Sequence, residues 1–472
     1  MPALETEIST ETLSKNINVS DSILSNIKFI TLISTLGGLL FGYDSGMING
    51  AMAYMQQDFN LTPLTEGMVT SFLLLGAAVG SISCGKFSDA YGRRNTILFL
   101  ATLFFLGALA CVFMPDATSM MVARFFLGIA VGGASVTVPT YLAEVAPTER
   151  RGQIVTRNEL MIVFGVTLAY VFNSIIGRVW GETYPGVWRW MFAIATLPAI
   201  ALFIGMFFVP ESPRWLVSKG KSREAWRVLK TIREKRHVRA ELAMIEDHAR
   251  RDKQQSESAL KHLSTPWVRR IFILGIGIAI IQQATGVNAI MYYGTQILTS
   301  SGFGRETALA ANVLNGVTAI VACLWGIHLL GKMGRKPMFM VGLAGTTLSL
   351  VMIAGMSAWL PQSEWRAYAI LASMVCFLVF IQGMIGPVTW VLLSEIFPLS
   401  IRGFAFGFSG FVLWSTNFVI GLAFPTLVAR IGVAATFMIF AGCTAVGMLF
   451  IARYLPETRG KSLEEIEAHF QQ

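Results

Sequence analysis

The sequence predicts an all-α membrane protein in which twelve transmembrane helices form two six-helix bundles. Three observations predict this fold: 54% of the 472 residues are hydrophobic, only 14% are charged, and the apolar residues gather in long runs. Soluble domains carry roughly 25% charged residues, and a soluble chain of this composition would leave too much apolar surface in water. The composition therefore argues against a soluble domain, and we do not expect an enzyme.

Twelve apolar runs are candidate spans, because roughly 20 helical residues cross the ~30 Å of hydrocarbon in a bilayer. The first six cover residues 29–50, 68–84, 97–114, 120–142, 160–176 and 191–209. The second six cover residues 271–293, 308–330, 338–360, 368–393, 404–427 and 433–451. We expect five regions along the chain: a disordered cytoplasmic tail (1–27), an N-terminal bundle (28–209), a cytoplasmic helical loop (210–270), a C-terminal bundle (271–452) and a second cytoplasmic tail (453–472).

The distribution of Lys and Arg predicts the orientation. With the amino terminus inside, the short inner loops carry ten of these residues and the outer loops five, which favours cytoplasmic termini. Sixteen of the 37 Lys and Arg residues lie between Arg214 and Arg270, and the aromatic residues of this segment are not interleaved with them in a stacking pattern. This segment is typical of a loop at an anionic membrane surface, so we expect membrane lipid as a partner and no nucleic acid.

The two halves of the chain repeat three motifs in the same order. GKFSDAYGRR (85–94) has a counterpart in GIHLLGKMGRK (326–336), YLAEVAPTERRG (141–152) in LLSEIFPLSIRG (392–403), and PESPR (210–214) in PETRG (456–460). Parallel repeats of this kind are found in transporters whose binding site lies between the halves and opens to each side in turn.

Asp44 lies deep in the first expected span, and Arg124 in the fourth is its natural partner. At ~1.5 Å per residue, Asp44 lies about 24 Å and Arg124 about 21 Å from the inner ends of their spans. A charge at the bilayer centre costs ~2.5–3.5 kcal/mol on the mildest scale. The pair is therefore either a static ion pair or a proton site whose affinity changes as Arg124 moves.

A second carboxylate, Glu159, lies at the start of the fifth span. Three roles are open to it: a hydrogen bond to a polyol hydroxyl, titration, or capping of a neighbouring helix.

The seventh span is unusually polar, with Gln282, Gln283, Asn288 and Tyr293 around Gly286. A break near Gly286 would direct these side chains into one cavity, as discontinuous helices do in transporters. Further amide and indole groups follow in later spans: Asn315, Trp390, Trp414 and Asn417. Amides both donate and accept hydrogen bonds and indole faces pack on C–H surfaces, which favours a neutral polyhydroxylated ligand. Each residue alone is also compatible with helix–helix packing.

Opposite charges recur where the repeats place the inner helix ends. They are Arg93, Glu144, Arg151, Glu211, Arg335, Glu395 and Arg402. They can form a cytoplasmic gate that holds the inner side closed, or they can simply set the topology.

No motif for a cofactor, a metal or a nucleotide is present. The five cysteines show no CxxC spacing. Gly460-Lys461-Ser462 is similar to the end of a phosphate-binding loop, but Leu455 stands where that motif requires glycine. We therefore expect an ion gradient to supply the energy.

The motifs together resemble the sugar porter family of the major facilitator superfamily. GGLLFGYD, the two glycine-rich GRR/GRK loops, PESPRWL, QQATGVNAIMYY, GPVTW, LLSEIFPLSIRG and PETRG carry the resemblance, which extends over residues 37–463. It implies the major facilitator fold and a proton role for Asp44 with Arg124, since facilitative glucose carriers have Asn at the position of Asp44. It maps the sugar site onto Gln282, Gln283, Asn288, Tyr293, Asn315, Gly386, Trp390 and Trp414, to which we add Phe41, Glu159 and Asn417.

Two positions depart from the pattern of the family's hexose and xylose carriers. Those carriers usually have Gln where this chain has Glu159, and xylose carriers have Gln where it has Leu413. The stretches NELMIV (158–163), AVGGASVTVP (130–139) and YYGT (292–295) are most similar to bacterial myo-inositol/proton symporters. The resemblance thus implies a monomeric inner-membrane transporter that imports a neutral cyclic polyol or sugar, myo-inositol first, with a proton.

The sequence is also compatible with three other functions. One is a proton symporter for galactose, glucose, arabinose or xylose, and another is a proton-independent facilitator, against which Asp44 argues. A third is a substrate sensor without flux, which usually adds a longer cytoplasmic extension.

Overall fold

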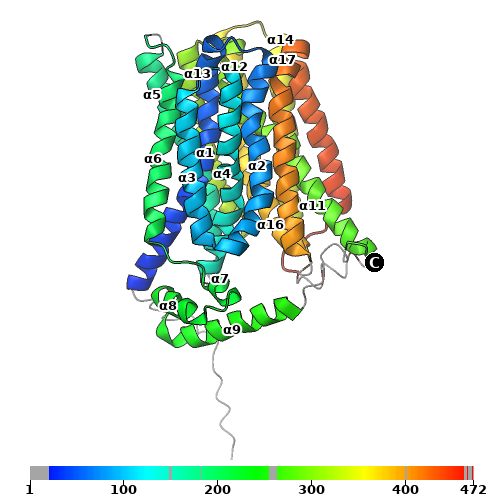
Figure 1. The fold of residues 1–472 in the computed structure, drawn as a ribbon. Coiled ribbons are helices and arrows are strands. Elements are labelled where there is room, and N and C mark those ends of the chain that lie inside the picture. The colour runs from blue at the N-terminus through cyan, green and yellow to red at the C-terminus, as the bar shows by residue number, and fades with distance from the viewer. Residues whose placement is uncertain are drawn as a thin grey trace, which may run out of the picture.

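The computed structural model describes residues 21–147, 151–181, 183–254, 263–398, 401–461, 465 and 470. Within these residues the regular structure is helical, and long helices stand side by side above a layer of short ones (Figure 1). We call the side on which the short helices α7 to α9 lie the near side and the opposite side the far side. Most of the expected first tail lies outside the described residues, and the chain is already helical from Asp21.

The first half of the chain forms six long helices. They are α1 (Asp21–Asp58), α2 (Pro63–Tyr91), α3 (Arg93–Phe113), α4 (Ala117–Val145), α5 (Arg151–Trp180) and α6 (Trp188–Phe207). Glycines allow close contact between them: a Cβ atom at Gly128 of α4 would lie 1.9 Å from the carbonyl oxygen of Leu73 in α2, and one at Gly42 of α1 would lie 1.8 Å from that of Ile162 in α5. Small residues serve this purpose in membrane proteins, where lipid tails remove the hydrophobic drive between helices.

Three short helices join the halves on the near side. They are α7 (Pro213–Ser218), α8 (Ser222–Ile232) and α9 (Lys235–Gln254). Arg233, just after α8, fixes this layer to the end of α4 because its guanidinium donates to the carbonyl oxygens of Val145 (3.0 Å) and Ala146 (2.9 Å). The same group forms an ion pair with Glu241 of α9 at 2.7 Å.

The second half is also helical but more often interrupted. Its elements are α11 (Pro266–Ala284), α12 (Val287–Ser301), α13 (Arg305–Leu330), α14 (Arg335–Trp359), α15 (Glu364–Phe380), the π-helix η2 (Ile381–Ile385), α16 (Gly386–Ile396) and α17 (Arg402–Tyr454). Eleven helical stretches among the described residues are long and apolar enough to cross a membrane. The longest holds two spans, because Gly432 has a non-helical backbone (φ 84°, ψ 168°). The prediction of an all-α fold with twelve spans is therefore confirmed.

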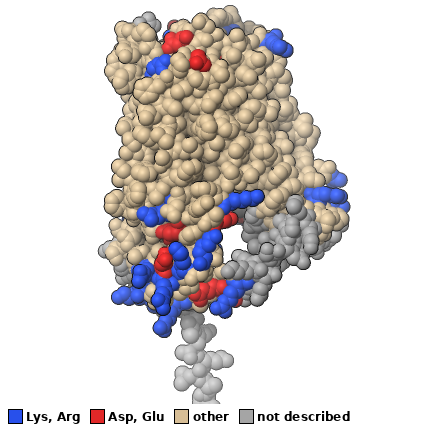
Figure 2. Space-filling view, viewed as in Figure 1, with Lys and Arg blue, Asp and Glu red and all other residues tan. Residues whose placement is uncertain are grey.

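Charged side chains gather at the two ends of the molecule. Figure 2 shows a broad uncharged band between a dense set of Lys, Arg, Asp and Glu on the near side and a sparse set on the far side. This band is the surface that a bilayer requires, since a charge exposed to hydrocarbon is costly.

Candidate functional site

A central cavity of about 110 Å³ lies between the two halves. The first half contributes residues of α1 and α5, and the second half contributes residues of α11, α12, η2, α16 and α17. Nine of the eleven residues that the sequence predicts for substrate binding line it: Phe41, Glu159, Gln282, Gln283, Asn288, Gly386, Trp390, Trp414 and Asn417. Its size suits a small ligand, because sites for drug-sized molecules occupy ~300–1,000 Å³.

The amide groups of the cavity meet across a helix break. Gly286 separates α11 from α12 and has a left-handed backbone (φ 79°), so the predicted break is confirmed. Asn288 donates to Gln283, and Gln283 donates to Oε1 of Gln282 at 2.7 Å. The three amides thus form a chain with alternating donors and acceptors, and such a chain can pair with hydroxyl groups, which also do both.

Aromatic side chains form another wall. Phe41 of α1 meets Trp414 of α17 edge to face, with ring centroids 5.2 Å apart, so this contact joins the two halves. Trp390 of α16 lies beside Phe406, with ring centroids 6.0 Å apart. Leu413, the position at which xylose carriers have Gln, also lines the cavity and adds an apolar surface.

Glu159 supplies the carboxylate among the described residues that line the cavity. It lies on α5, whereas the amide chain lies on α11 and α12. A ligand in the cavity would therefore meet an acceptor-only group from the first half and amides from the second.

Asn417 connects the cavity to the interior of the second half. Its amide nitrogen donates to the hydroxyl of Tyr292 at 3.1 Å, while its Oδ1 atom has no hydrogen-bond partner among the described residues. An unpaired buried acceptor is costly, so this oxygen is available to a hydroxyl of a ligand.

The structure does not bring Tyr293 and Asn315 into this cavity. The Tyr293 hydroxyl donates to the carbonyl oxygen of Gly421 at 2.9 Å, and its ring stacks on Phe424 at 5.1 Å on the far side. Asn315 donates to Oδ1 of Asn312 at 3.2 Å, within a polar group on α13.

Two polar residues of the cavity were missed by the sequence analysis. Gln382 lies on η2 and Ser45 directly follows Asp44. An amide inside the apolar run 368–393 was the signal for Gln382. The π-helix that turns this residue toward the cavity gave no such signal, although π-helical turns are frequent at functional sites.

Asp44 and Arg124 form a buried ion pair, as the depths of their spans predicted. The two side chains are 2% and 1% exposed, and Nη2 of Arg124 lies 3.5 Å from Oδ2 of Asp44. Neither carboxylate oxygen has a hydrogen-bond partner among the described residues. The guanidinium lies over the ring of Phe192, 5.9 Å from its centroid. The distance is longer than that of an N⁺–H···O⁻ hydrogen bond. The two groups therefore attract each other by charge without a hydrogen bond between them.

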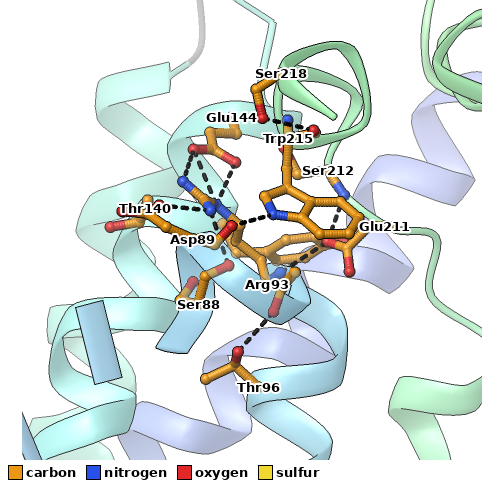
Figure 3. Close-up of polar contacts among 12 residues, drawn as sticks. Ser88, Asp89, Arg93, Thr96, Thr140, Glu144, Glu211, Ser212, Trp215 and Ser218 are labelled. Carbon is orange, nitrogen blue, oxygen red and sulfur yellow. Dashed lines mark hydrogen bonds and ion pairs between the residues drawn. The ribbon is translucent and has the colours of Figure 1, made fainter. Parts of the chain in front are cut away.

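The near-side charges of the first half form one cluster (Figure 3). Nε of Arg93 lies 3.0 Å from Glu144, and Nη1 lies 2.8 Å from Asp89. Glu211 accepts a hydrogen bond from the backbone N–H of Arg93 at 2.9 Å. The indole N–H of Trp215 donates to the carbonyl oxygen of Asp89 at 2.9 Å, which ties α7 to the same cluster.

The second half has a matching cluster, in which Arg335 lies 2.9 Å from Glu395. Among the predicted gate residues, Arg93, Glu144, Glu211, Arg335 and Glu395 thus lie in one or the other cluster. Both clusters lie within their own half. The side chains of Arg151 and Arg402 lie outside the part of the structure that is described.

The site therefore combines a ligand cavity between two halves with a charge pair buried in one of them. No group of three or more His, Cys, Asp or Glu side chains that could hold a metal occurs among the described residues. The arrangement suits binding and translocation of a small polar solute.

Comparisons with known proteins agree with this geometry. Residues 30–470 match the family described as "Sugar (and other) transporter". The chain is 53% identical to the major myo-inositol transporter IolT of Bacillus subtilis (strain 168), over 96% of each chain.

Solved structures of the xylose transporter XylE from E. coli share the fold. In a partially occluded inward-open conformation the TM-score is 0.81, with 29% identity over 93% of this chain and 100% of that one. For the proton:xylose symporter XylE bound to 6-bromo-6-deoxy-D-glucose, the TM-score is 0.80, with 30% identity over 95% and 99%. The protein is a multi-pass membrane protein of the sugar transporter family, with the major facilitator fold.

Proposed function

We propose that the protein imports myo-inositol together with a proton by alternating access. The observation that carries this proposal is the central cavity, which is lined both by Glu159 and by the amide chain of Gln282, Gln283 and Asn288. A ring with six hydroxyl groups can donate to the carboxylate and exchange hydrogen bonds with the amides at the same time. The similarity to IolT, whose name gives myo-inositol as its substrate, supports this choice.

The energy source that we propose is proton entry through the Asp44–Arg124 pair. A carboxylate that is buried, 3.5 Å from its guanidinium and otherwise without hydrogen bonds, can exchange a proton when the partner moves. A potential of about 150 mV supplies ~3.4 kcal/mol per charge, which is enough for roughly 300-fold accumulation with one proton per substrate. The similarity to XylE, named as a proton:xylose symporter, supports the coupling.

We place the protein in the bacterial inner membrane as a monomer, with both termini and the helices α7 to α9 in the cytoplasm. The excess of Lys and Arg on the near side supports this orientation. The two halves are hydrogen-bonded on the far side, where Asn49 of α1 donates to the carbonyl oxygen of Met291 at 2.7 Å and accepts from the backbone N–H of Thr295 at 2.9 Å. The described conformation is then closed to the outside.

Uptake by proteoliposomes tests the proposal. The purified protein is reconstituted with a pH gradient and a membrane potential, and labelled myo-inositol, glucose, galactose, arabinose and xylose are offered in parallel. We expect myo-inositol to accumulate fastest and an uncoupler to abolish its accumulation. Faster accumulation of a hexose or pentose would favour a sugar symporter, and uptake that ignores the uncoupler would favour a facilitator.

A further inference from the structure

A second hollow, of about 410 Å³, opens on the far side between the two halves. It is separate from the central cavity, and we call it the far-side hollow. The first half lines it with residues of α1 and α2, and the second half with residues of α12, α13 and α17. Its polar residues include Gln56, Glu66, Gln296 and Arg305.

Glu66 is the buried charge of this hollow. It lies in the first turn of α2 and is 6% exposed. Its Oε2 atom accepts a hydrogen bond from the amide of Gln56 at 2.6 Å, and its Oε1 atom accepts one from the amide of Gln296 at 2.6 Å. In the described part of the chain no ion pair neutralises this carboxylate, and the guanidinium of Arg305 lies over the ring of Tyr54, 4.9 Å from its centroid.

The two hydrogen bonds differ in what they connect. Gln56 is on α1, in the same half as Glu66, whereas Gln296 is on α12 in the other half. The next residue toward the break, Thr295, bonds Asn49 of α1, so two adjacent positions of α12 are attached to the first half. Any movement that opens the far side must break the bond between Glu66 and Gln296, while the bond to Gln56 can persist.

Burial makes this bond strong while the two halves stay in contact on the far side. A hydrogen bond to an ionised group is about twice as strong as one between neutral groups, and a buried carboxylate that loses a donor is left with a desolvation cost. When the halves separate, water can replace Gln296 as the donor. The carboxylate thus favours two well-defined states. In one the far side is closed and Gln296 is the donor, and in the other the far side is open and water is the donor.

We propose that Glu66 is a positioning residue of the transport cycle, which holds the far side closed by accepting the hydrogen bond of Gln296. This inference rests on the proposed function, because it assumes that the halves separate on the far side. It predicts that the inter-half bond, and not the intra-half bond, sets the ratio of far-side-open to far-side-closed molecules.

Gln296→Leu and Gln56→Leu form a matched pair for the test. Each substitution removes one amide that lies 2.6 Å from the same carboxylate, and only the first removes a bond between the halves. Spin labels are placed on cysteines at Leu64 of α2 and Thr299 of α12, both of which are exposed. The exposed native cysteines, Cys376 and Cys443, are replaced by alanine. Pulsed electron resonance then gives the distance distribution across the far side in the full-length protein.

We expect Gln296→Leu to raise the ratio of long to short distances about tenfold, which corresponds to ~1.4 kcal/mol. Gln56→Leu should change that ratio less than twofold. An unchanged distribution in Gln296→Leu, or an equal shift in both variants, would overturn the proposal. Melting temperatures of both variants show whether they remain folded, and Gln296→Ala replaces Gln296→Leu if the latter does not.

The half-saturation concentration of uptake provides a second readout. A purely structural role of Glu66 would lower the maximal rate of both variants alike. A shift in the ratio of far-side-open to far-side-closed molecules would instead change the half-saturation concentration for substrate offered on the far side, and only in Gln296→Leu. The distance measurement needs no substrate, so it can succeed or fail independently of the myo-inositol assignment.

Discussion

The two halves of the molecule are nearly the same at the near side. Arg93 pairs with Glu144 at 3.0 Å in the first half, and Arg335 pairs with Glu395 at 2.9 Å in the second. In each half a further carboxylate, Glu211 or Glu457, accepts the backbone N–H of that arginine at 2.9 Å. The repeated motifs therefore fold into repeated local structures.

The agreement extends to the neighbouring residue. Arg94 donates to the carbonyl oxygen of Met206 at 3.0 Å, and Lys336 donates to that of Ala452 at 2.9 Å. Each contact fixes a loop to the near-side end of the last helix of its half. These contacts join elements within a half, so each half can move as a unit.

Inside the membrane the halves differ. The first half carries the charges Asp44, Arg124 and Glu159, whereas the second half carries the amide chain of α11 and α12 and two indoles of the cavity. The two halves thus share the near-side contacts that join their own elements, and they differ at the central positions. We therefore propose that the first half handles charge and that the second recognises a neutral solute.

The largest expected effect comes from removing the buried charge of the first half. Asp44→Asn should abolish accumulation, because an amide cannot bind and release a proton. The ratio of internal to external substrate concentration should fall from a maximum of roughly 300 to one. Counterflow of labelled substrate should persist. Asp116→Asn is the matched control, since Asp116 is an exposed cap of α4 and Asn caps equally well. Unchanged accumulation in Asp44→Asn would show that the proton binds elsewhere.

Removing a recognition group of the second half should act on binding. We expect Trp390→Ala and Gln282→Ala each to weaken substrate binding more than tenfold in calorimetry, because lost stacking and hydrogen bonds are worth ~1–3 kcal/mol each in a dry site. Trp359→Ala, at a side chain that is 87% exposed, is the control for the loss of an indole. Normal binding in both cavity variants would place the substrate outside the central cavity.

Glu159 tests whether the division between the halves is strict, because it is a first-half charge in the wall of the cavity. An ionised carboxylate only accepts hydrogen bonds, whereas Gln also donates. Glu159→Gln should therefore weaken myo-inositol transport more than hexose transport and shift the preference ratio about tenfold, or ~1.4 kcal/mol. Paired competition between myo-inositol and glucose measures the ratio, with the exposed Glu306→Gln as control. If both rates fall together, Glu159 is structural or belongs to the proton path.

The sequence predicted the features that depend on composition and local pattern. Long apolar runs specify the spans, and a glycine amid amides specifies the break at Gly286. The depths of Asp44 and Arg124 can be counted along their helices, so the sequence predicts the pair that the structure shows at 3.5 Å.

Features that depend on helix rotation were harder to predict. Tyr293 and Asn315 lie on the same or a neighbouring helix as cavity residues, but their side chains turn toward the far side or into α13. Gln382 reaches the cavity through a π-helical turn, which no residue pattern specifies. The roles of the site residues stay predictions until variants are measured.

The near-side clusters are not identical in their electrostatics. Burial raises the pKa of Glu211, and the N–H groups of Ser212, Arg94 and Arg93 offset this only in part. Burial also acts on Glu457, but hydrogen bonds from the backbone of Arg459, Arg335, Lys336 and Thr458 outweigh it and lower the pKa below 4.5. Compared with a carboxyl group in water, the ionised form is therefore less favoured at Glu211 and more favoured at Glu457.

The smallest expected effect follows from these opposite shifts. Glu211 destabilises the folded state while it is ionised, so its contribution should improve as the pH falls from neutral through its raised pKa toward 4.5, the ordinary value. Glu457 stabilises the folded state above pH 4.5, and this contribution should be lost as the pH falls through its lowered pKa. The difference in melting temperature between the wild type and Glu211→Gln should therefore shift in favour of the wild type when the pH is lowered from 7 to 5. The difference between the wild type and Glu457→Gln should stay constant over that range, and the wild type should lose its advantage only below pH 4.5. Parallel curves for the two variants would mean that the clusters are electrostatically equivalent, and that the asymmetry of the protein is confined to its membrane interior.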